Sequence, residues 1–195
     1  MIKLERPQCP LWLADIWEKK SRRWKAKLDN PQKSNNWDWY KHEGQKINIQ
    51  LLPLLRKMTD DHCSFCDSFP MKRIGKTVEH FKPKSAYPLE SYKWENLFLC
   101  CSNCQEKNDE FDELLLKPDE IDYEFNRYFD YDYETGFLNP NKWSSLEDQR
   151  RAEATIRIYK LNDFDRPEDR QMTFRQFYDS NNPILVEFSY RFILV

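Results

Sequence analysis

The chain has 195 residues, 39% hydrophobic and 33% charged, with a formal net charge of −2 and an isoelectric point near 6.0. This length suits one domain, or a small core with helical extensions. The charge argues against a free-standing, non-specific nucleic-acid binder, which is normally basic. No apolar run approaches the roughly 20 residues of a membrane span, and no signal-peptide profile is present, so we expect a cytoplasmic protein without membrane contact.

Residues 1–60 are predicted to form an N-terminal helical segment. Apolar side chains over residues 10–29 recur at spacings of three and four, which is typical of an amphipathic helix, and basic side chains cover its other face. That basic face is either a solvated surface or a contact for phosphates or a partner. Residues 31–44 indicate a loop packed by its aromatics. A second helix over 45–59 contains Pro53, which either kinks it or marks its true start.

Residues 61–112 are predicted to form a metal-stapled core. Two Cys-x-x-Cys knuckles, Cys63 with Cys66 and Cys101 with Cys104, bracket 34 residues (67–100). Without a secretory signal, paired knuckles predict a tetrahedral zinc site, and four thiolates leave no open position, so the zinc is structural.

Other potential ligands lie beside these knuckles. His62 adjoins the first knuckle and is a minor alternative ligand. Cys100 precedes the second, but adjacent strand residues point to opposite faces, so Cys100 is predicted to point into the core. Cys100 and Cys9 are the remaining thiols, and this cysteine usage favours a reducing compartment.

Between the knuckles lie a carboxylate–imidazole pair, Glu79-His80, and an amide, Asn96. A metal-assisted hydrolase needs such groups: a carboxylate for a hard divalent cation, an imidazole to deprotonate water and an amide to hold the imidazole. The short apolar runs 74–81 and 96–101 predict two strands, followed by a helix from Ser102 to about Phe111. Because strand neighbours alternate, Glu79 and His80 need a bend or a strand end to serve one site.

These motifs resemble the HNH endonucleases, and in particular the HNH nuclease subunit (PtuB-like) of Septu and Septu-like retron anti-phage systems. The resemblance spans roughly residues 50–170, and its residues are Glu79-His80-Phe81-Lys82-Pro83-Lys84-Ser85, Tyr87-Pro88, Tyr92, Trp94-x-Asn96-Leu97, the second knuckle, Lys107, Ala154-Thr155-Ile156 and Leu161-Asn162. It implies a zinc-stapled ββα-metal fold with His80 as general base, Glu79 on a catalytic Mg²⁺ or Mn²⁺, and Asn96 orienting the His80 loop or imidazole.

The resemblance also implies partners and a substrate. The partner would be an ABC/SMC-like ATPase subunit (PtuA type), and in retron-like systems also a reverse transcriptase with its RNA–DNA. The substrate would be DNA, or tRNA in some retron-associated versions, and the sequence does not choose between them.

Two roles at the predicted reaction centre stay open. Related families often have Asn or His directly after the last knuckle cysteine, where this chain has Gln105. Asn108 would share the same helix face at i+3, so either amide is a candidate second ligand of the catalytic metal. Lys84 and Lys107 are candidate phosphate contacts, or exposed solubilising lysines.

Residues 113–195 are predicted to form a hairpin and a helical segment packed on the core. The stretch 109–134 holds eleven acids against two basic residues, so we expect a solvated or protein-docking face that does not touch substrate. A hairpin turns near Gly136, and helices follow from Ser144 or Ser145 to about Tyr159 and over 167–179. The apolar tail 184–195 is either buried or meets a partner, and we hypothesise docking on the ATPase.

The sequence therefore predicts an α+β protein, with a zinc-stapled HNH core inside a mainly helical shell. The predicted function is metal-dependent cleavage of phosphodiester bonds by an anti-phage effector. The alternative is a non-catalytic zinc-binding adaptor that retains an HNH-like shape. A zinc-dependent DNA reader fits less well, because the segment after Cys104 is acidic rather than basic.

Overall fold

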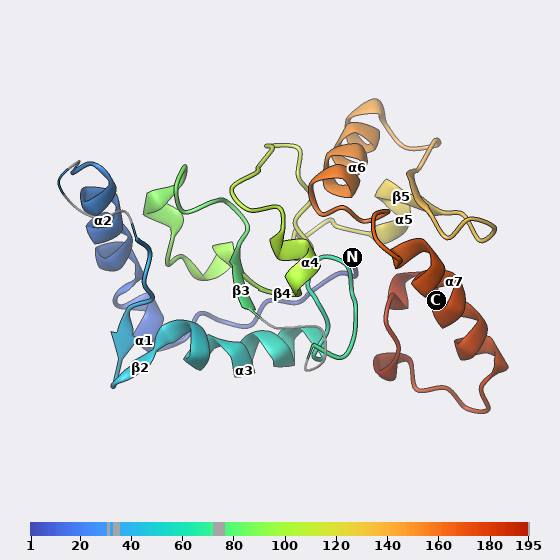
Figure 1. The fold of residues 1–195 in the computed structure, drawn as a ribbon, viewed down its shortest axis with the longest axis horizontal. Coiled ribbons are helices and arrows are strands. Elements are labelled where there is room, and N and C mark those ends of the chain that lie inside the picture. Colours follow the sequence, from blue (N-terminus) through green and yellow to red (C-terminus); the bar gives the residue numbers. More distant parts are fainter. Residues whose placement is uncertain (31, 33–35, 72–76, 195) are drawn as a thin grey trace.

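The structure, a computed structural model, describes residues 1–30, 32, 36–71 and 77–194. Its described part combines helices with small antiparallel sheets of two strands each, which confirms the α+β class. Figure 1 shows α2 at one end, β3, β4 and α4 in the middle, and α6 and α7 at the other end. One cluster of buried apolar side chains, reaching from Met1 to Leu194, includes residues of all three predicted segments.

The N-terminal segment begins with two helices, α1 (Leu11–Ala14) and α2 (Trp17–Leu28), where the sequence predicted one. Ile16 between them leaves the helical conformation, with φ −123° and ψ −19°. α2 packs against the 3₁₀ turn η1 (Pro88–Glu90) and buries Trp24. In the sequence, Asn30-Pro31 also predicts the end of this helix, and Pro31 lies outside the described residues.

A short hairpin of β1 (Lys41–His42) and β2 (Gln45–Lys46) leads into α3 (Ile47–Thr59). These strands occupy what was predicted as the end of a loop and the start of a helix. α3 keeps Pro53 in its interior, on its exposed side, so Pro53 does not mark the helix start. The opposite face of α3 is buried and contacts β3 and β4.

The middle of the chain has the predicted order of two strands and a helix. β3 (Thr77–His80) pairs antiparallel with β4 (Leu97–Cys100), and α4 (Ser102–Gln105) follows. The turns η1 and η2 (Trp94–Asn96) connect the two strands. Residues 74–76 of the predicted first strand lie outside the described part.

The predicted extent of the helix after the second knuckle is wrong. α4 ends at Gln105 instead of about Phe111, and Asn108 adopts a left-handed backbone with φ 50°. Lys107 turns inward and its Nζ lies 3.2 Å from Glu79 Oε1. A buried ion pair thus fixes the chain after α4, and tertiary contact overrides local helix propensity.

The C-terminal segment contains the predicted hairpin and helices. After the single turn α5 (Phe125–Tyr128), β5 (Phe129–Tyr131) pairs antiparallel with β6 (Leu138–Pro140). Gly136 lies in the connection at φ +76°, a conformation that favours glycine. Ser145 caps α6 (Leu146–Ile158) by accepting a hydrogen bond from the Asp148 N–H, and α7 (Arg166–Asp179) follows.

The acidic stretch 109–134 is not an uninterrupted acidic face. Arg151 of α6 binds Glu120 at 2.7 Å, and Arg157 pairs with Glu110. Asp119 is buried and lies 2.5 Å from Arg6 of the N-terminal segment. Several acids of this stretch therefore hold the C-terminal segment to its neighbours instead of facing solvent alone.

The apolar tail divides into an exposed and a buried part. Ile184 and Val186 are exposed in η3 and its flank, whereas Phe192, Ile193 and Leu194 at η4 (Arg191–Ile193) belong to the buried core. The hypothesis that the tail docks on a partner is corrected for these buried residues, because their apolar side chains already pack inside this chain.

Arg191 fixes the tail to the first knuckle. Its guanidinium lies 2.7 Å from the buried Asp67 carboxylate and 3.0 Å from Asp60, and it also donates to the Thr59 carbonyl. The backbone N–H of Arg191 donates to the same Asp67 carboxylate at 2.7 Å.

We expect Arg191→Ala to lower the free energy of unfolding by about 3–5 kcal/mol, because it leaves Asp67 as an uncompensated buried charge. Urea unfolding followed by circular dichroism measures this. Arg175→Ala, at an exposed position of α7, is the matched control, with an expected effect within about 0.5 kcal/mol. Equal midpoints for the two variants would contradict the anchoring role.

Candidate metal centre and candidate active site

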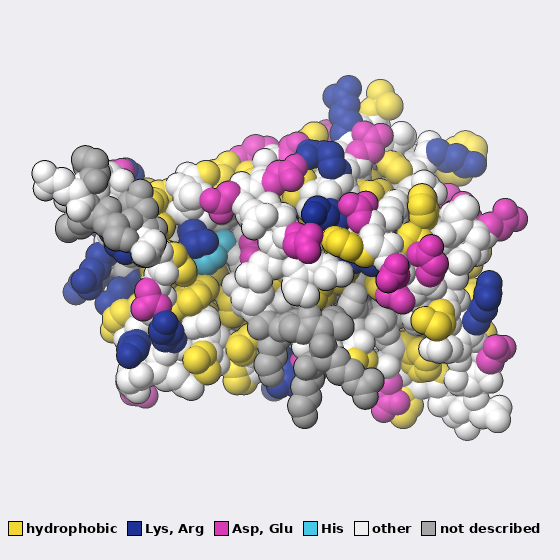
Figure 2. All heavy atoms as spheres, viewed as in Figure 1, with side chains coloured by type: hydrophobic (Ala, Val, Ile, Leu, Met, Phe, Trp, Pro, Cys, Tyr) yellow, Lys and Arg dark blue, Asp and Glu magenta, His cyan; other side chains and the backbone are white. Residues whose placement is uncertain are grey.

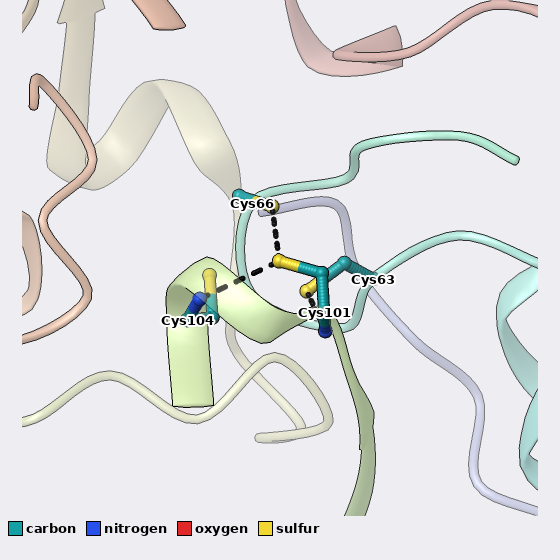
Figure 3. A group of neighbouring side chains, drawn as sticks. All are labelled: Cys63, Cys66, Cys101 and Cys104. Carbon is teal, nitrogen blue, oxygen red and sulfur yellow. Dashed lines mark hydrogen bonds between the residues drawn. The ribbon is translucent and has the colours of Figure 1, made fainter. Parts of the chain in front are cut away.

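The two knuckles bring four buried sulfurs together (Figure 3). Cys63 and Cys66 lie in the turns after α3, Cys101 caps the N-terminus of α4, and Cys104 lies within α4. Their Sγ atoms all lie within 4.8 Å of one another, and those of Cys66 and Cys101 are 3.6 Å apart. Sulfurs around a tetrahedral zinc are about 3.8 Å apart, so this cluster could hold a metal ion such as zinc.

Neighbouring donors favour negative charge on these sulfurs. The Cys101 N–H donates to Cys63 Sγ at 3.4 Å, and the Cys104 N–H donates to Cys101 Sγ at 3.5 Å. Arg166 of α7 donates from Nη2 to Cys104 Sγ at 3.2 Å. A buried guanidinium beside a thiolate offsets part of the charge that four thiolates bring to one ion.

The structure keeps the other two candidate ligands out of this cluster. Both ring nitrogens of His62 lie against backbone carbonyls, those of Asp60 at 2.7 Å and Phe188 at 2.9 Å. Cys100 is fully buried, and its thiol donates to the Cys101 carbonyl. Its sulfur interacts with Cys63 and Cys104, but it is not one of the four cysteines whose Sγ atoms all lie within 4.8 Å of one another.

We expect one tightly bound metal ion per chain, lost in Cys63→Ser and retained in Cys100→Ser. The reason is that only the first substitution removes one of the four clustered thiolates. Elemental analysis of the purified variants, with circular dichroism to follow folding, measures both properties. Loss of the ion from Cys100→Ser would overturn the ligand assignment.

A cleft of about 460 Å³ brings the second group of predicted residues together. Its wall includes both Glu79 and His80, because His80 is the last residue of β3, the strand end that a shared site requires. The other predicted residues of the lining are Lys84, Gln105 and Asn108. Asn96 does not line the cleft.

His80 is held in one orientation by aromatic packing. Its ring stacks on Trp39 at 5.1 Å with an interplanar angle of 10°, and Trp37 meets it edge-on at 5.3 Å. Burial, together with the positive charge of Lys84, lowers the pKa of His80 to about 3. The imidazole is therefore neutral near pH 7.

The tautomer of His80 follows from its hydrogen bond. Nε2 lies 2.9 Å from the Ser91 carbonyl, which can only accept, so the proton is on Nε2. Nδ1 then carries the free lone pair and has no hydrogen-bond partner among the described residues. A neutral imidazole with one fixed N–H and one free lone pair can accept a proton, but its low pKa makes it a weak base near pH 7.

Glu79 is paired with Lys107. Burial raises the pKa of Glu79, and the nearby ammonium of Lys107 opposes that shift. The side chain of Lys107 is 0% exposed, so it does not fit the expected contact with a substrate phosphate. It neutralises the carboxylate instead.

Asn96 holds the loop that follows His80, which is one of its two expected roles. Its Oδ1 accepts from the Lys82 N–H at 2.7 Å, and its Nδ2 donates to the carbonyls of Lys82 and Glu90. It does not contact the imidazole. Asn96 thus fixes both ends of residues 82–90, the segment that carries Lys84 into the cleft.

The cleft contains oxygen donors that the sequence reasoning left out. Asp109 and Glu106 line it beside Gln105 and Asn108, so four side chains after the second knuckle add to Glu79. Gln105 and Asn108 do not share a helix face as expected, because α4 ends between them. The acidic composition of residues 106–110 was a usable signal for these ligands, whereas nothing local indicated that Trp39 packs on His80.

We expect His80 to stay neutral from pH 5 to pH 8 in the folded protein, because its pKa is lowered to about 3 by burial. Its imidazole NMR signals should not shift over this range. Since the unfolded chain binds this proton more tightly, the stabilising contribution of neutral His80 is lost as pH falls from about 6.5 towards 3. A titration midpoint near 6.5 for His80 would contradict its burial.

No protein-family model and no curated protein matches the chain. Among the described residues, no helix is both long enough and apolar enough to cross a membrane.

Proposed function

We propose that the protein is a metal-dependent HNH-type endonuclease that hydrolyses phosphodiester bonds. The observation that carries the proposal is the arrangement at the end of β3, where His80 and Glu79 line one cleft and the free Nδ1 of His80 is held ready to accept a proton. The order β3, β4 and α4, stapled by two cysteine knuckles, supports the HNH reading of this site.

Each residue around the cleft has a proposed role. His80 removes a proton from the attacking water, and the Ser91 carbonyl fixes its ring through Nε2. Asn96 holds the 82–90 segment so that Lys84 faces the cleft and can meet a substrate phosphate. The aromatic wall of Trp37 and Trp39 keeps the imidazole in one orientation.

The lining residues fit a hard divalent cation. Mg²⁺ and Mn²⁺ favour carboxylate and amide oxygens, which Glu79, Asp109, Gln105 and Asn108 provide. Such an ion, when bound, stabilises charge on the phosphate and the leaving oxygen. Lys107 supplies a positive charge beside Glu79. A bound ion would therefore have to displace Lys107 from the Glu79 carboxylate or share that carboxylate with it. Zinc is the metal we propose for the cysteine cluster.

The resemblance to the HNH subunit of Septu and Septu-like retron systems supports a partner and a substrate class. We accordingly propose an anti-phage effector that acts with an ABC/SMC-like ATPase, and in a retron-like system with a reverse transcriptase. DNA and tRNA are the two candidate substrates. The net charge of −2 agrees with a substrate that a partner delivers.

We expect His80→Asn to reduce cleavage by about 10²–10⁴-fold, the usual contribution of a general base. Asparagine retains a donor for the Ser91 carbonyl but cannot take up the proton, and it disturbs the buried site less than alanine. Cleavage of DNA and tRNA is measured with Mg²⁺ or Mn²⁺, with and without an ABC/SMC-like ATPase of the PtuA type. The matched control is His42→Asn, because the ring of His42 stacks on Trp12 away from the cleft.

Wild-type cleavage rates in His80→Asn would remove His80 from the mechanism. The second candidate function is a non-catalytic metal-binding adaptor, and the ion pair of Glu79 with Lys107 favours it, because an ammonium neutralises the main candidate ligand. Absence of any His80-dependent cleavage with both substrates, both metals and the ATPase would support the adaptor.

A further inference from the structure

A local concentration of positive charge outside the cleft lies on α2. This helix carries six basic residues and a single acid, Glu18. Two are paired within the helix or at its end, Arg22 with Glu18 and Lys25 with Asp29. The other four have no ion pair among the described residues, and they are Lys19, Lys20, Arg23 and Lys27. Figure 2 shows Lys and Arg side chains gathered at the end of the molecule where α2 lies.

Three of these unpaired cations meet in a pocket. Lys20, Arg23 and Lys27 follow one face of α2 at spacings of three and four, and they line a hollow of about 270 Å³. The Lys20 ammonium lies 3.3 Å from the ring centroid of Tyr40, which holds the cation over the pocket. Lys27 donates to the Asn36 carbonyl, and its ammonium has further donors available.

The one acid in this pocket is already neutralised. Asp38 lies 2.6 Å from Lys46 of β2, and the hydrogen bond from that ammonium lowers the pKa of Asp38. The remaining lining residues are aromatic: Trp24, Tyr40 and Tyr92. Trp24 and Tyr92 are buried, so what the pocket presents is a net positive charge, which suits the phosphates of a nucleic-acid strand.

Direct hydrogen bonds connect α2 to the segment that forms the candidate active site. The indole N–H of Trp24 donates to the carbonyl of Lys84 at 2.8 Å, and Lys84 itself lines the cleft. The Ser21 hydroxyl accepts from the Tyr92 N–H at 3.1 Å and contacts the hydroxyl of Ser91. The carbonyl of Ser91 in turn accepts a hydrogen bond from Nε2 of His80. Any ligand held by α2 is thus positioned relative to the reaction centre.

We propose that the basic pocket of α2 binds phosphates of the nucleic-acid strand that is cleaved, and holds that strand next to the cleft. This inference rests on the proposed nuclease function for its purpose, but strand binding is measured separately from cleavage. A nucleic acid fits better than an acidic protein, because the three cations lie on a helix that is hydrogen-bonded to the lining of a candidate phosphodiester-cleaving site. The pocket raises the local affinity for phosphates in a chain whose overall charge is slightly negative.

The test uses the full-length, metal-loaded protein with the His80→Asn substitution, so that substrate stays intact. Its binding to fluorescein-labelled single-stranded DNA and RNA is followed by fluorescence anisotropy over a range of salt concentrations. The test variant adds Lys20→Gln, Arg23→Gln and Lys27→Gln. The matched control adds Lys142→Gln, Arg150→Gln and Arg175→Gln, which remove the same charge from exposed positions of the C-terminal segment.

We expect the test variant to bind at least about tenfold more weakly than the control at low salt. The slope of its plot of log affinity against log salt concentration should be less negative by about 2. Each phosphate contact on a single strand contributes roughly −0.7 to that slope, and three contacts are removed. Equal affinity or an equal salt slope in the two triple variants overturns the proposal. It is also overturned if the parent protein binds neither strand. The same holds if an acidic peptide, added at the same concentration of negative charges as the strand, displaces the strand.

Cleavage separates this inference from the proposed function. If the pocket variant binds weakly and no form of the protein cleaves, the strand site stands and the nuclease proposal fails. If cleavage depends on His80 while the pocket variant, with His80 restored, cleaves like the control at limiting substrate, the nuclease proposal stands and the strand site fails.

Discussion

The cluster of four cysteines is the constraint on which the rest of the structure depends. It joins the turn after α3 to the start of α4, and the segment between the knuckles contains β3, β4 and Ser91, whose carbonyl fixes the His80 ring. The C-terminal segment is tied to the same place, because Arg166 reaches Cys104 and Arg191 reaches Asp67 beside Cys66. Two strands of four residues each bury little apolar area alone, so a metal ion bound by the four cysteines would have a large effect on their stability.

The candidate reaction centre depends on the balance between burial and hydrogen bonding. A buried histidine is expensive to protonate, and the aromatic rings around His80 provide that burial while the Ser91 carbonyl satisfies its only donor. Glu79 lies in the same low-dielectric surroundings but has a cation, Lys107, to compensate it. Two adjacent residues of β3 are therefore buried in different ways: His80 as a neutral imidazole, and Glu79 as a carboxylate paired with a lysine.

The distribution of charge matters more than its sum. Acids of the 109–134 stretch are matched by arginines of α6 and of the N-terminal segment, so they act as links between segments. The cations of α2 have fewer partners among the described residues, and one of its faces stays positive. A net charge of −2 is therefore compatible with a local surface that attracts phosphates.

Short-range patterns determined much of the fold from the sequence. The spacing of the knuckle cysteines predicted the cysteine cluster, alternation along a strand separated Cys100 from Cys101, and the N-cap preference of serine placed the start of α6 at Ser144 or Ser145. These properties depend on covalent spacing and backbone geometry, which the sequence contains. The sequence also singled out Glu79 and His80 as a carboxylate–imidazole pair between the knuckles, but their placement at one site was implied by the resemblance to HNH endonucleases and not by spacing.

Only the tertiary structure decided which distant groups meet. Lys107 looked like a surface lysine until its burial against Glu79 was seen, and the last apolar residues of the tail are core because Arg191 anchors them to Asp67. Likewise, no local pattern places Trp39 on His80. Such contacts depend on how whole segments pack, and packing is set by the shape and charge of surfaces that form only when the chain is folded.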